Sequence, residues 1–228
     1  LNTAIPASDS EHDKKACDFY DAQFNRLYLD PLYNQKYSEL LFECLLQKNL
    51  IKQPDLTFIK EGDLEIIATE TDFLGVNYYS RGVIRSDEVD ENVNNKPTVY
   101  LGPKTDFGWE VYPQGLYDLL KQLQIEYNVK EIIITENGCS YSDGPDENKT
   151  INDTKRIEYH KSHVEQIQIA VNDGIPCTGY FAWSFMDNFE WAEGYSQRFG
   201  LVWVDFETLE RIPKESYYWY QNFIKSQK

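Results

Sequence analysis

The chain has 228 residues, of which 41% are hydrophobic and 15% aromatic, so it can bury a sizeable core, and a single unit spanning residues 1–228 is expected. Its 38 acidic and 22 basic residues give a net charge of −16, which argues against nucleic acid or an anionic membrane as a partner. The four cysteines have neither the spacing of metal ligands nor the density of a disulfide scaffold. Buried thiols in a reducing compartment are therefore expected, and the cytoplasm is the predicted location.

The first part of the chain predicts strands and helices in alternation. Residues 1–5 are a short candidate strand. The helix that follows has apolar residues at helical spacing, namely Tyr20, Phe24 and Leu27. We expect Asp30 and Pro31 to end this helix, because a residue before proline avoids the helical region. The next helix has an apolar face formed by Tyr37, Leu40, Leu41, Cys44 and Leu45. Residues 72–79 predict a strand, and residues 83–108 predict a polar loop.

The second part of the chain continues this alternation. Residues 115–127 predict an amphipathic helix, on which one stripe consists of Leu116, Leu119, Leu120 and Leu123. A longer helix, which ends near Gly174, has a predicted face formed by Ile157, His160, Val164, Ile167 and Val171. Residues 177–184 predict the next strand, and residues 199–206 a short extended segment. Pro213 is expected in the first turn of the last helix, on which Tyr217, Tyr220 and Ile224 form the apolar face.

The segment Glu131–Gly138 contains a carboxylate at an informative position. Three isoleucines and a threonine lead into Glu136, and Asn-Gly follows at once. A continuous apolar run bounded by a turn signal indicates a buried parallel strand, and α/β enzymes place their chemistry at the carboxyl ends of such strands. Because burying an unpaired charge is costly, Glu136 is interpreted as a functional carboxylate rather than as a helix cap or a loop residue.

The order of elements predicts an α/β fold. Strands separated by helices indicate right-handed βαβ units, and four such units make half of an eightfold barrel. The segments 131–138 and 180–191 together resemble the family 1 glycoside hydrolases, which are retaining β-glucosidases. This resemblance covers essentially the whole chain and implies strands five to eight of a (β/α)8 TIM barrel. The family's proton donor lies in an Asn-Glu-Pro segment on an earlier strand, and this chain has no such segment. The chain is therefore expected to be a C-terminal half, with the N-terminal half barrel as its partner.

The resemblance implies the catalytic roles. Retaining glycosidases use two carboxyl groups about 5–5.5 Å apart, of which one attacks the anomeric carbon and the other protonates the leaving oxygen. Glu136 corresponds to the nucleophile, and Tyr79 to the tyrosine that donates a hydrogen bond to it. Asn77, a substrate-binding residue in the family, is two residues before Tyr79 and faces the same way, while Tyr78 faces the other way. Without Glu136, ordinary sheet tyrosines would be the preferred interpretation. The segment Trp109–Pro113 also matches the family and is interpreted as structural.

The resemblance also implies a sugar-binding set. Glu190 and Trp191 correspond to a pair that accepts sugar hydroxyls and covers the apolar ring face. Trp183 corresponds to the floor beneath the bound ring, and the peptide between it and Ser184 is cis in the family, so a cis bond is predicted here. Phe199 corresponds to a residue near the same pocket. Core packing is the alternative role of these aromatic residues, and for Phe199 the two interpretations have equal weight. By chemistry alone Glu190 is also a candidate acid, whereas the resemblance makes it a hydroxyl binder.

No metal or cofactor is expected. His160 and His163 are three residues apart on a helix without further ligands nearby, which predicts one half-buried and one solvated histidine. The predicted activity is hydrolysis of terminal non-reducing β-D-glucosyl residues with retention of configuration, in a β-glucoside or oligosaccharide. The substrate is expected to carry no phosphate, because Glu190 would repel a phosphate dianion. Activity is expected only with the N-terminal half. The alternative is a non-catalytic half barrel that binds sugar weakly or is purely structural.

Overall fold

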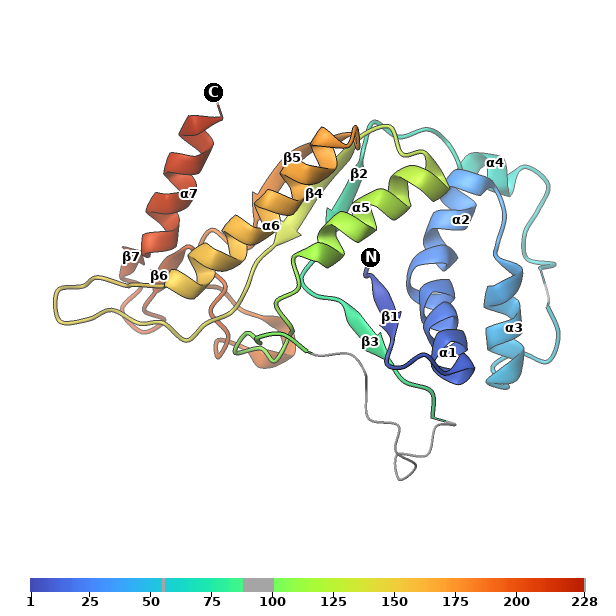
Figure 1. The fold of residues 1–228 in the computed structure, drawn as a ribbon, viewed down its shortest axis with the longest axis horizontal. Coiled ribbons are helices and arrows are strands. Elements are labelled where there is room, and N and C mark those ends of the chain that lie inside the picture. The colour runs from blue at the N-terminus through green and yellow to red at the C-terminus, as the bar shows by residue number, and fades with distance from the viewer. Residues whose placement is uncertain (55, 88–100, 228) are drawn as a thin grey trace. The chain divides into compact units, whose positions relative to one another are not determined.

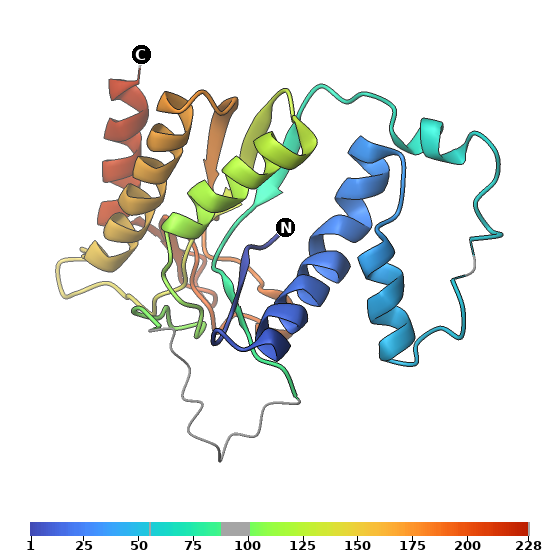
Figure 2. The same ribbon diagram turned by 45° about the vertical axis from the view of Figure 1, so that its right-hand side comes forward.

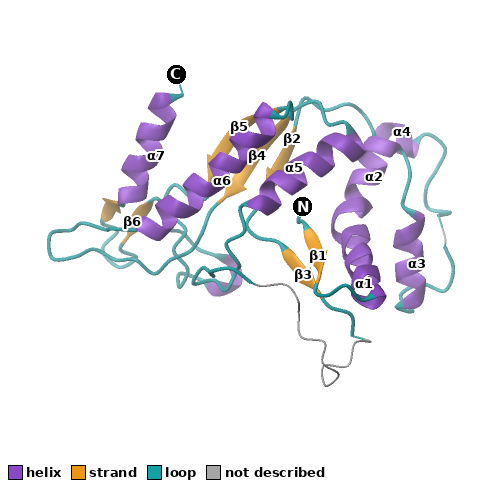
Figure 3. Ribbon diagram, in the orientation of Figure 1, coloured by secondary structure: helices purple, strands orange, loops and turns teal. Residues whose placement is uncertain are grey.

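The computed structural model describes residues 1–54, 56–87 and 101–227 (Figure 1). The elements, coloured by type in Figure 3, are in chain order β1 (Ala4–Pro6), α1 (Glu11–Asp21), the π-helix η1 (Ala22–Arg26), α2 (Leu27–Asn34), α3 (Glu39–Gln47), α4 (Asp63–Ile67), β2 (Leu74–Asn77), β3 (Gly82–Ile84), α5 (Gln114–Tyr127), β4 (Ile132–Asn137), α6 (Thr154–Asn172), β5 (Cys177–Ala182), the 3-10 helix η2 (Trp191–Glu193), β6 (Val202–Val204), β7 (Arg211–Pro213) and α7 (Glu215–Ser226).

The chain forms two compact units, each built from several stretches of sequence. The first unit comprises Leu1–Leu74, Arg81–Leu101 and Asp118–Glu131, and the second comprises Gly75–Ser80, Gly102–Tyr117 and Ile132–Lys228. The expectation of one unit over residues 1–228 stays a prediction. All residues predicted for the site, from Asn77 to Phe199, belong to the second unit.

In the first unit, β1 and β3 pair in parallel, and α1 packs against both strands. The Ser10 hydroxyl caps α1 by accepting a hydrogen bond from the Asp13 amide at 3.1 Å. Strand β3 overlaps the start of the segment 83–108 that was predicted to be loop, so that prediction is wrong at residues 83 and 84. A Gly-Val-Ile run is too short to show an alternating pattern. Residues 88–100 of the predicted loop lie outside the described residues.

The helix that begins at Glu11 does not end at Asp30 and Pro31, contrary to the sequence prediction. It continues through η1 into α2, which ends where Gln35 adopts a left-handed conformation with φ of 52°. Pro31 lies inside α2 and is buried, and Asp30 is buried and accepts a hydrogen bond from the Tyr127 hydroxyl at 2.8 Å. Tertiary packing therefore outweighs the local preference of the residue before a proline. The expected face also differs, because Phe24 is 55% exposed while Cys17 and Phe19 are buried.

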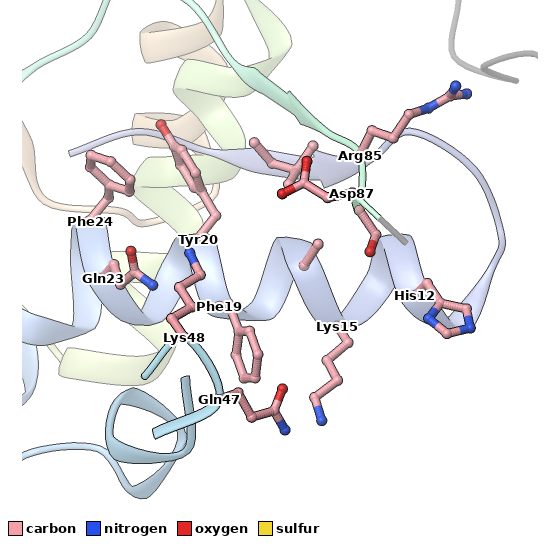
Figure 4. Close-up of a pocket in the computed structure, with 13 residues that line it drawn as sticks. His12, Lys15, Phe19, Tyr20, Gln23, Phe24, Gln47, Lys48, Arg85 and Asp87 are labelled. Carbon is pink, nitrogen blue, oxygen red and sulfur yellow. The ribbon is translucent and has the colours of Figure 1, made fainter. Parts of the chain in front are cut away.

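The first unit contains a pocket of about 330 Å³ (Figure 4). Its lining combines basic and aromatic side chains from α1, η1, the end of α3 with the residue after it, and the residues after β3, among them Lys15, Tyr20, Phe24, Lys48 and Arg85. Tyr20 and Phe24 stack with ring centroids 4.4 Å apart, and Lys15 pairs with Glu43 at 2.9 Å. The lining therefore includes a lysine whose charge already has a partner.

The second unit contains a sheet with the strand order β2–β4–β5, in which β4 and β5 are parallel. Helix α6 packs on β5, and α7 packs against α6, as Figure 2 shows. Helix α5 has residues in both units. Its prediction is confirmed, because its four leucines, Leu116, Leu119, Leu120 and Leu123, are 0–1% exposed.

The four cysteines, two in each unit, are free and buried, as predicted.

Two predictions in the second unit are wrong. On α6 only His160 of the predicted face is fully buried, whereas Ile157, Val164 and Ile167 are half-buried and Val171 is exposed. The helix also buries Arg156, Tyr159, His163 and Ala170. This face contains polar groups with internal hydrogen-bond partners, which a hydrophobic pattern cannot identify. Pro213 does not begin α7 but ends β7, opposite Val202 in β6, and α7 starts two residues later after Lys214.

Candidate active site

The predicted nucleophile stands at the carboxyl end of β4, where the strand is irregular. Between Ile134 and Asn137 β4 advances three residues while β5 advances two, from Tyr180 to Ala182, which is a β-bulge. On a regular strand Glu136 would share the buried face of Ile134. In the structure Asn137 is 0% exposed and Glu136 is partly exposed, so the bulge turns Glu136 out of the buried layer.

Tyr79 donates a hydrogen bond from its hydroxyl to Glu136 Oε2 at 2.7 Å, as the sequence prediction requires. The segment after β2 is aligned with β4 by the Tyr78 amide, which donates to the Glu136 carbonyl at 2.9 Å. Tyr78 is 1% exposed and Tyr79 points the other way, toward the carboxylate. Asn77 Oδ1 accepts a hydrogen bond from the Thr135 hydroxyl at 2.7 Å, which fixes the side chain of Asn77 beside the same strand.

The Tyr79 hydroxyl remains protonated as a donor. Burial raises the pKa of Tyr79 most, and the hydrogen bond to Glu136 and the charges of Glu136 and Glu190 raise it further. A phenol that keeps its proton can donate to a carboxylate, and a charge-assisted bond of this kind is stronger than one between neutral groups. The two side chains therefore form a stable donor and acceptor pair.

An aromatic cluster surrounds Tyr79. The rings of Trp109 and Phe199 lie 5.2 Å and 6.1 Å from the Tyr79 ring between centroids, and Phe107 lies 4.2 Å from Trp109. Phe199 is 3% exposed. Core packing is therefore a role that Phe199 has in this structure. From the sequence, Trp109 was predicted only as part of a structural segment, and Phe107 was not a candidate. Their place next to Tyr79 depends on the loop between β3 and α5, whose path the sequence pattern does not show.

Trp183 lies immediately beside the end of β4. The peptide bond between Trp183 and Ser184 is cis, which confirms the prediction. The Trp183 amide donates to the Asn137 carbonyl at 2.9 Å. A Cβ atom on Gly138 would lie 1.8 Å from the Trp183 carbonyl oxygen, so only glycine fits at this position.

Glu190 stands close enough to Glu136 for the two carboxylates to interact. Burial raises the pKa of Glu190, a hydrogen bond with Trp183 lowers it, and the negative charge of Glu136 raises it again, with a net increase. The Glu190 amide donates to the Gly194 carbonyl at 2.6 Å, which closes the turn around η2. Trp191 is 81% exposed, so the structure brings Trp183, Glu190 and Glu136 together but leaves the Trp191 ring open to solvent.

A buried ionic cluster holds the segment that leads to Glu190. Asp187 is 4% exposed and accepts hydrogen bonds from Arg198 Nη1 at 2.7 Å, Lys214 Nζ at 3.2 Å and the Gly200 amide at 2.9 Å. Burial, followed by the charge of Arg156, lowers the pKa of Lys214 to about 8, while Asp187 opposes this change. These partners could not be predicted from the sequence, because Arg198 and Lys214 are separated from Asp187 along the chain.

Among the described residues, no group of three or more His, Cys, Asp or Glu side chains is arranged to hold a metal ion. His163 is 0% exposed, so the prediction that it is solvated is wrong, and His160 is also 0% exposed rather than half-buried. The His163 ring stacks on Tyr159 at 4.0 Å, and its Nδ1 lies 2.7 Å from the Tyr159 carbonyl oxygen. In the described part of the chain, every helix is too short or too polar to span a bilayer.

A sequence profile of glycosyl hydrolase family 1 matches residues 1–228, and the chain belongs to this family. It is 42% identical to the 1,4-β-D-glucan glucohydrolase of Thermotoga neapolitana, over 97% of this chain and 48% of that protein. It is 38% identical to the 6-phospho-β-galactosidase of Staphylococcus haemolyticus, over 94% of this chain and 50% of that protein.

The solved structure of the family 1 β-glucosidase from Thermotoga maritima, in complex with isofagomine lactam, has the same fold. It matches with a TM-score of 0.83 and 40% identity, over 99% of this chain and 49% of that chain. The chain therefore spans about half the length of the proteins it matches and forms part of an α/β barrel.

Proposed function

We propose that this chain supplies the nucleophile and much of the sugar site of a retaining β-glucosidase. In this proposal its parallel strands are strands five to eight of a (β/α)8 barrel, and the substrate is a β-glucoside or oligosaccharide with a terminal non-reducing β-D-glucosyl residue. The observation that carries the proposal is the 2.7 Å hydrogen bond from the Tyr79 hydroxyl to Glu136 Oε2. Glu190 is close enough for its charge to raise the pKa of Tyr79. Membership of glycosyl hydrolase family 1 supports it independently.

The chemistry assigned to Glu136 has two steps. A carboxylate oxygen of Glu136 attacks the anomeric carbon while the bond to the leaving oxygen breaks, and the leaving group takes the electron pair and a proton from a second carboxylic acid. Water then attacks the anomeric carbon, the bond to Glu136 breaks, and the second carboxylate accepts the proton of water. The Tyr79 hydroxyl donates a hydrogen bond to the Glu136 carboxylate whenever that carboxylate is charged. This is the case before Glu136 attacks and again as Glu136 leaves the anomeric carbon.

Substrate binding is assigned to the side chains near Glu136. The Glu190 carboxylate is oriented by its hydrogen bond with Trp183 and accepts sugar hydroxyls. The indole of Trp183 lies under the ring, and the exposed ring of Trp191 covers the ring's apolar face. Asn77 and Phe199 complete the set, the first as a polar contact and the second as support for Tyr79.

The proposed substrate carries no phosphate. Glu190 is negatively charged and already experiences the charge of Glu136, so a phosphate dianion nearby would add repulsion. A relative named 6-phospho-β-galactosidase makes this a point to test. We expect hydrolysis of an aryl β-glucoside and far slower hydrolysis of its 6-phosphate. The reverse preference would contradict the binding role given to Glu190.

The acid that protonates the leaving group is assigned to an N-terminal half barrel, and the two halves together are called the assembled enzyme below. The test is to mix this chain with such a half and to follow an aryl β-glucoside by proton NMR. We expect turnover only in the mixture, with the β-anomer of glucose released first. Release of the α-anomer would contradict the nucleophile assignment. Absence of turnover in the mixture would favour the non-catalytic alternative, a half barrel that binds sugar or is structural.

A further inference from the structure

The side chain of Asn137, next to Glu136 in the sequence, is buried and makes three hydrogen bonds. Its Nδ2 donates to the Tyr78 carbonyl at 2.8 Å and to the Tyr159 hydroxyl at 3.1 Å. Its Oδ1 accepts from the Tyr180 hydroxyl at 2.7 Å. A carbonyl can only accept, so the contact with Tyr78 determines which end of the amide carries nitrogen. One amide therefore joins three segments: the one after β2, helix α6 and strand β5.

The contacts continue on both sides of this amide. The Tyr159 hydroxyl donates onward to the Tyr79 carbonyl at 2.9 Å. On the other side, His160 Nδ1 lies 2.8 Å from the Tyr180 hydroxyl. Tyr180 has one hydroxyl proton and gives it to Asn137, so His160 Nδ1 must be the donor in that contact. All donors then point in one direction, from His160 through Tyr180, Asn137 and Tyr159 to the peptide of Tyr79.

The network carries no net charge. Burial, followed by the charge of Arg156, lowers the pKa of His160 to about 3, so the ring is neutral at physiological pH. Burial also raises the pKa of Tyr159 and Tyr180 well above the ordinary value. The groups therefore add no net charge near the carboxylate of Glu136, and their hydrogen bonds fix the positions of the segments they join.

We propose that Asn137, with the Tyr159 and Tyr180 hydroxyls, is a positioning residue that sets the distance between Tyr79 and Glu136. Adjacent residues of a strand face opposite sides, and the bulge in β4 places Asn137 in the buried layer and Glu136 on the other side. Glu136 is fixed through the backbone it shares with Asn137. Tyr79 is fixed through two backbone carbonyls. Its own carbonyl accepts from the Tyr159 hydroxyl, and the Tyr78 carbonyl accepts from Asn137 Nδ2. The catalytic consequence of this proposal rests on the proposed function.

The test compares two tyrosine variants in the assembled enzyme. Tyr159→Phe removes the hydroxyl between Asn137 and the Tyr79 carbonyl. Tyr220→Phe is the matched control, because its part-buried hydroxyl donates to the Tyr180 carbonyl at 3.1 Å and not to a side chain of the network. The probe is 2,4-dinitrophenyl 2-deoxy-2-fluoro-β-D-glucopyranoside, whose dinitrophenolate leaves without a proton donor as the bond to Glu136 forms.

We expect Tyr159→Phe to lower the labelling rate constant at saturating probe by about tenfold or more, with the half-saturation concentration within about twofold. Tyr220→Phe should change neither. A merely structural role for Tyr159 would instead lower stability and leave the rate constant of the folded fraction unchanged, which would overturn the proposal. If Tyr159→Phe does not fold, Tyr180→Phe, which removes the donor to Asn137 Oδ1, is measured with the same expectation and the same control.

A second readout does not depend on turnover. A crystal structure of Tyr159→Phe should show the Tyr79 hydroxyl and Glu136 Oε2 farther apart than about 3.5 Å, beyond hydrogen-bond length. An unchanged separation of 2.7 Å would overturn the positioning role. If the unsubstituted assembled enzyme is not labelled at Glu136, the proposed function fails on its own, and this structural readout still decides the positioning role.

Discussion

Replacement of Gly138 by alanine is expected to destabilise the chain strongly, because two backbones meet at this residue. The added Cβ would lie 1.8 Å from the Trp183 carbonyl oxygen and 2.9 Å from its carbonyl carbon. Neither atom can move as a side chain does, so β4 and the segment after β5 must separate. Their separation weakens the 2.9 Å hydrogen bond from the Trp183 amide to the Asn137 carbonyl.

The size of this effect follows from two contributions. Overpacking costs about 1–3 kcal/mol, and loss of a buried hydrogen bond costs about 1 kcal/mol, so a loss of roughly 2–4 kcal/mol is expected. For a chain of this size the thermal midpoint should fall by roughly 5–15 °C. Urea unfolding followed by circular dichroism measures the free energy, and differential scanning fluorimetry measures the midpoint.

Gly144→Ala is the control for this experiment, since no atom lies within 4 Å of a Cβ placed there. It should change stability by less than about 0.5 kcal/mol. If Gly138→Ala behaves like Gly144→Ala, the close approach of β4 and Trp183 does not exist in solution, and the placement of Trp183 beside the site is wrong.

Three further predictions concern the site and its support. Glu136→Gln should reduce hydrolysis by the assembled enzyme on the order of 10⁴-fold or more with a thermal midpoint close to that of the parent, and robust turnover would contradict the nucleophile assignment. Tyr79→Phe should lower kcat about ten- to a hundredfold by removing a donor to a charged group, whereas Tyr220→Phe should not. Burial lowers the pKa of His160 to about 3 and of His163 to about 4 from 6.5, so the unfolded chain binds protons that the folded chain does not. Stability should therefore fall as pH drops from about 6.5, by up to about 1.4 kcal/mol per pH unit for each histidine, and NMR should show no titration of either ring between pH 7 and 5.

The sequence identifies the parts of the site that depend on local pattern. An Ile-rich run that ends in Glu136 predicts a strand with a carboxylate at its carboxyl end, and β4 has this arrangement. The resemblance adds Tyr79, and the hydrogen bond between the two side chains is present. The cis bond after Trp183 is also confirmed.

Other features could not be predicted, because they depend on contacts between distant residues. The β-bulge that exchanges the faces of Glu136 and Asn137 is defined by the register with β5. The buried face of α6 includes polar side chains such as His163, whose Nδ1 contacts the Tyr159 carbonyl of its own helix, and an apolar pattern gives no sign of this. Pro31 lies inside α2 because packing of the first unit outweighs its local preference.

The central claim is that Glu136 is the nucleophile, and covalent trapping tests it most directly. The assembled enzyme is treated with the dinitrophenyl 2-fluoroglucoside, digested with a protease, and its peptides are sequenced by mass spectrometry. The account predicts one fluoroglucosyl group per enzyme, on the peptide containing Thr135-Glu136-Asn137 and on the glutamate itself. A label on Glu190 or on any other residue, or no label at all, would contradict it.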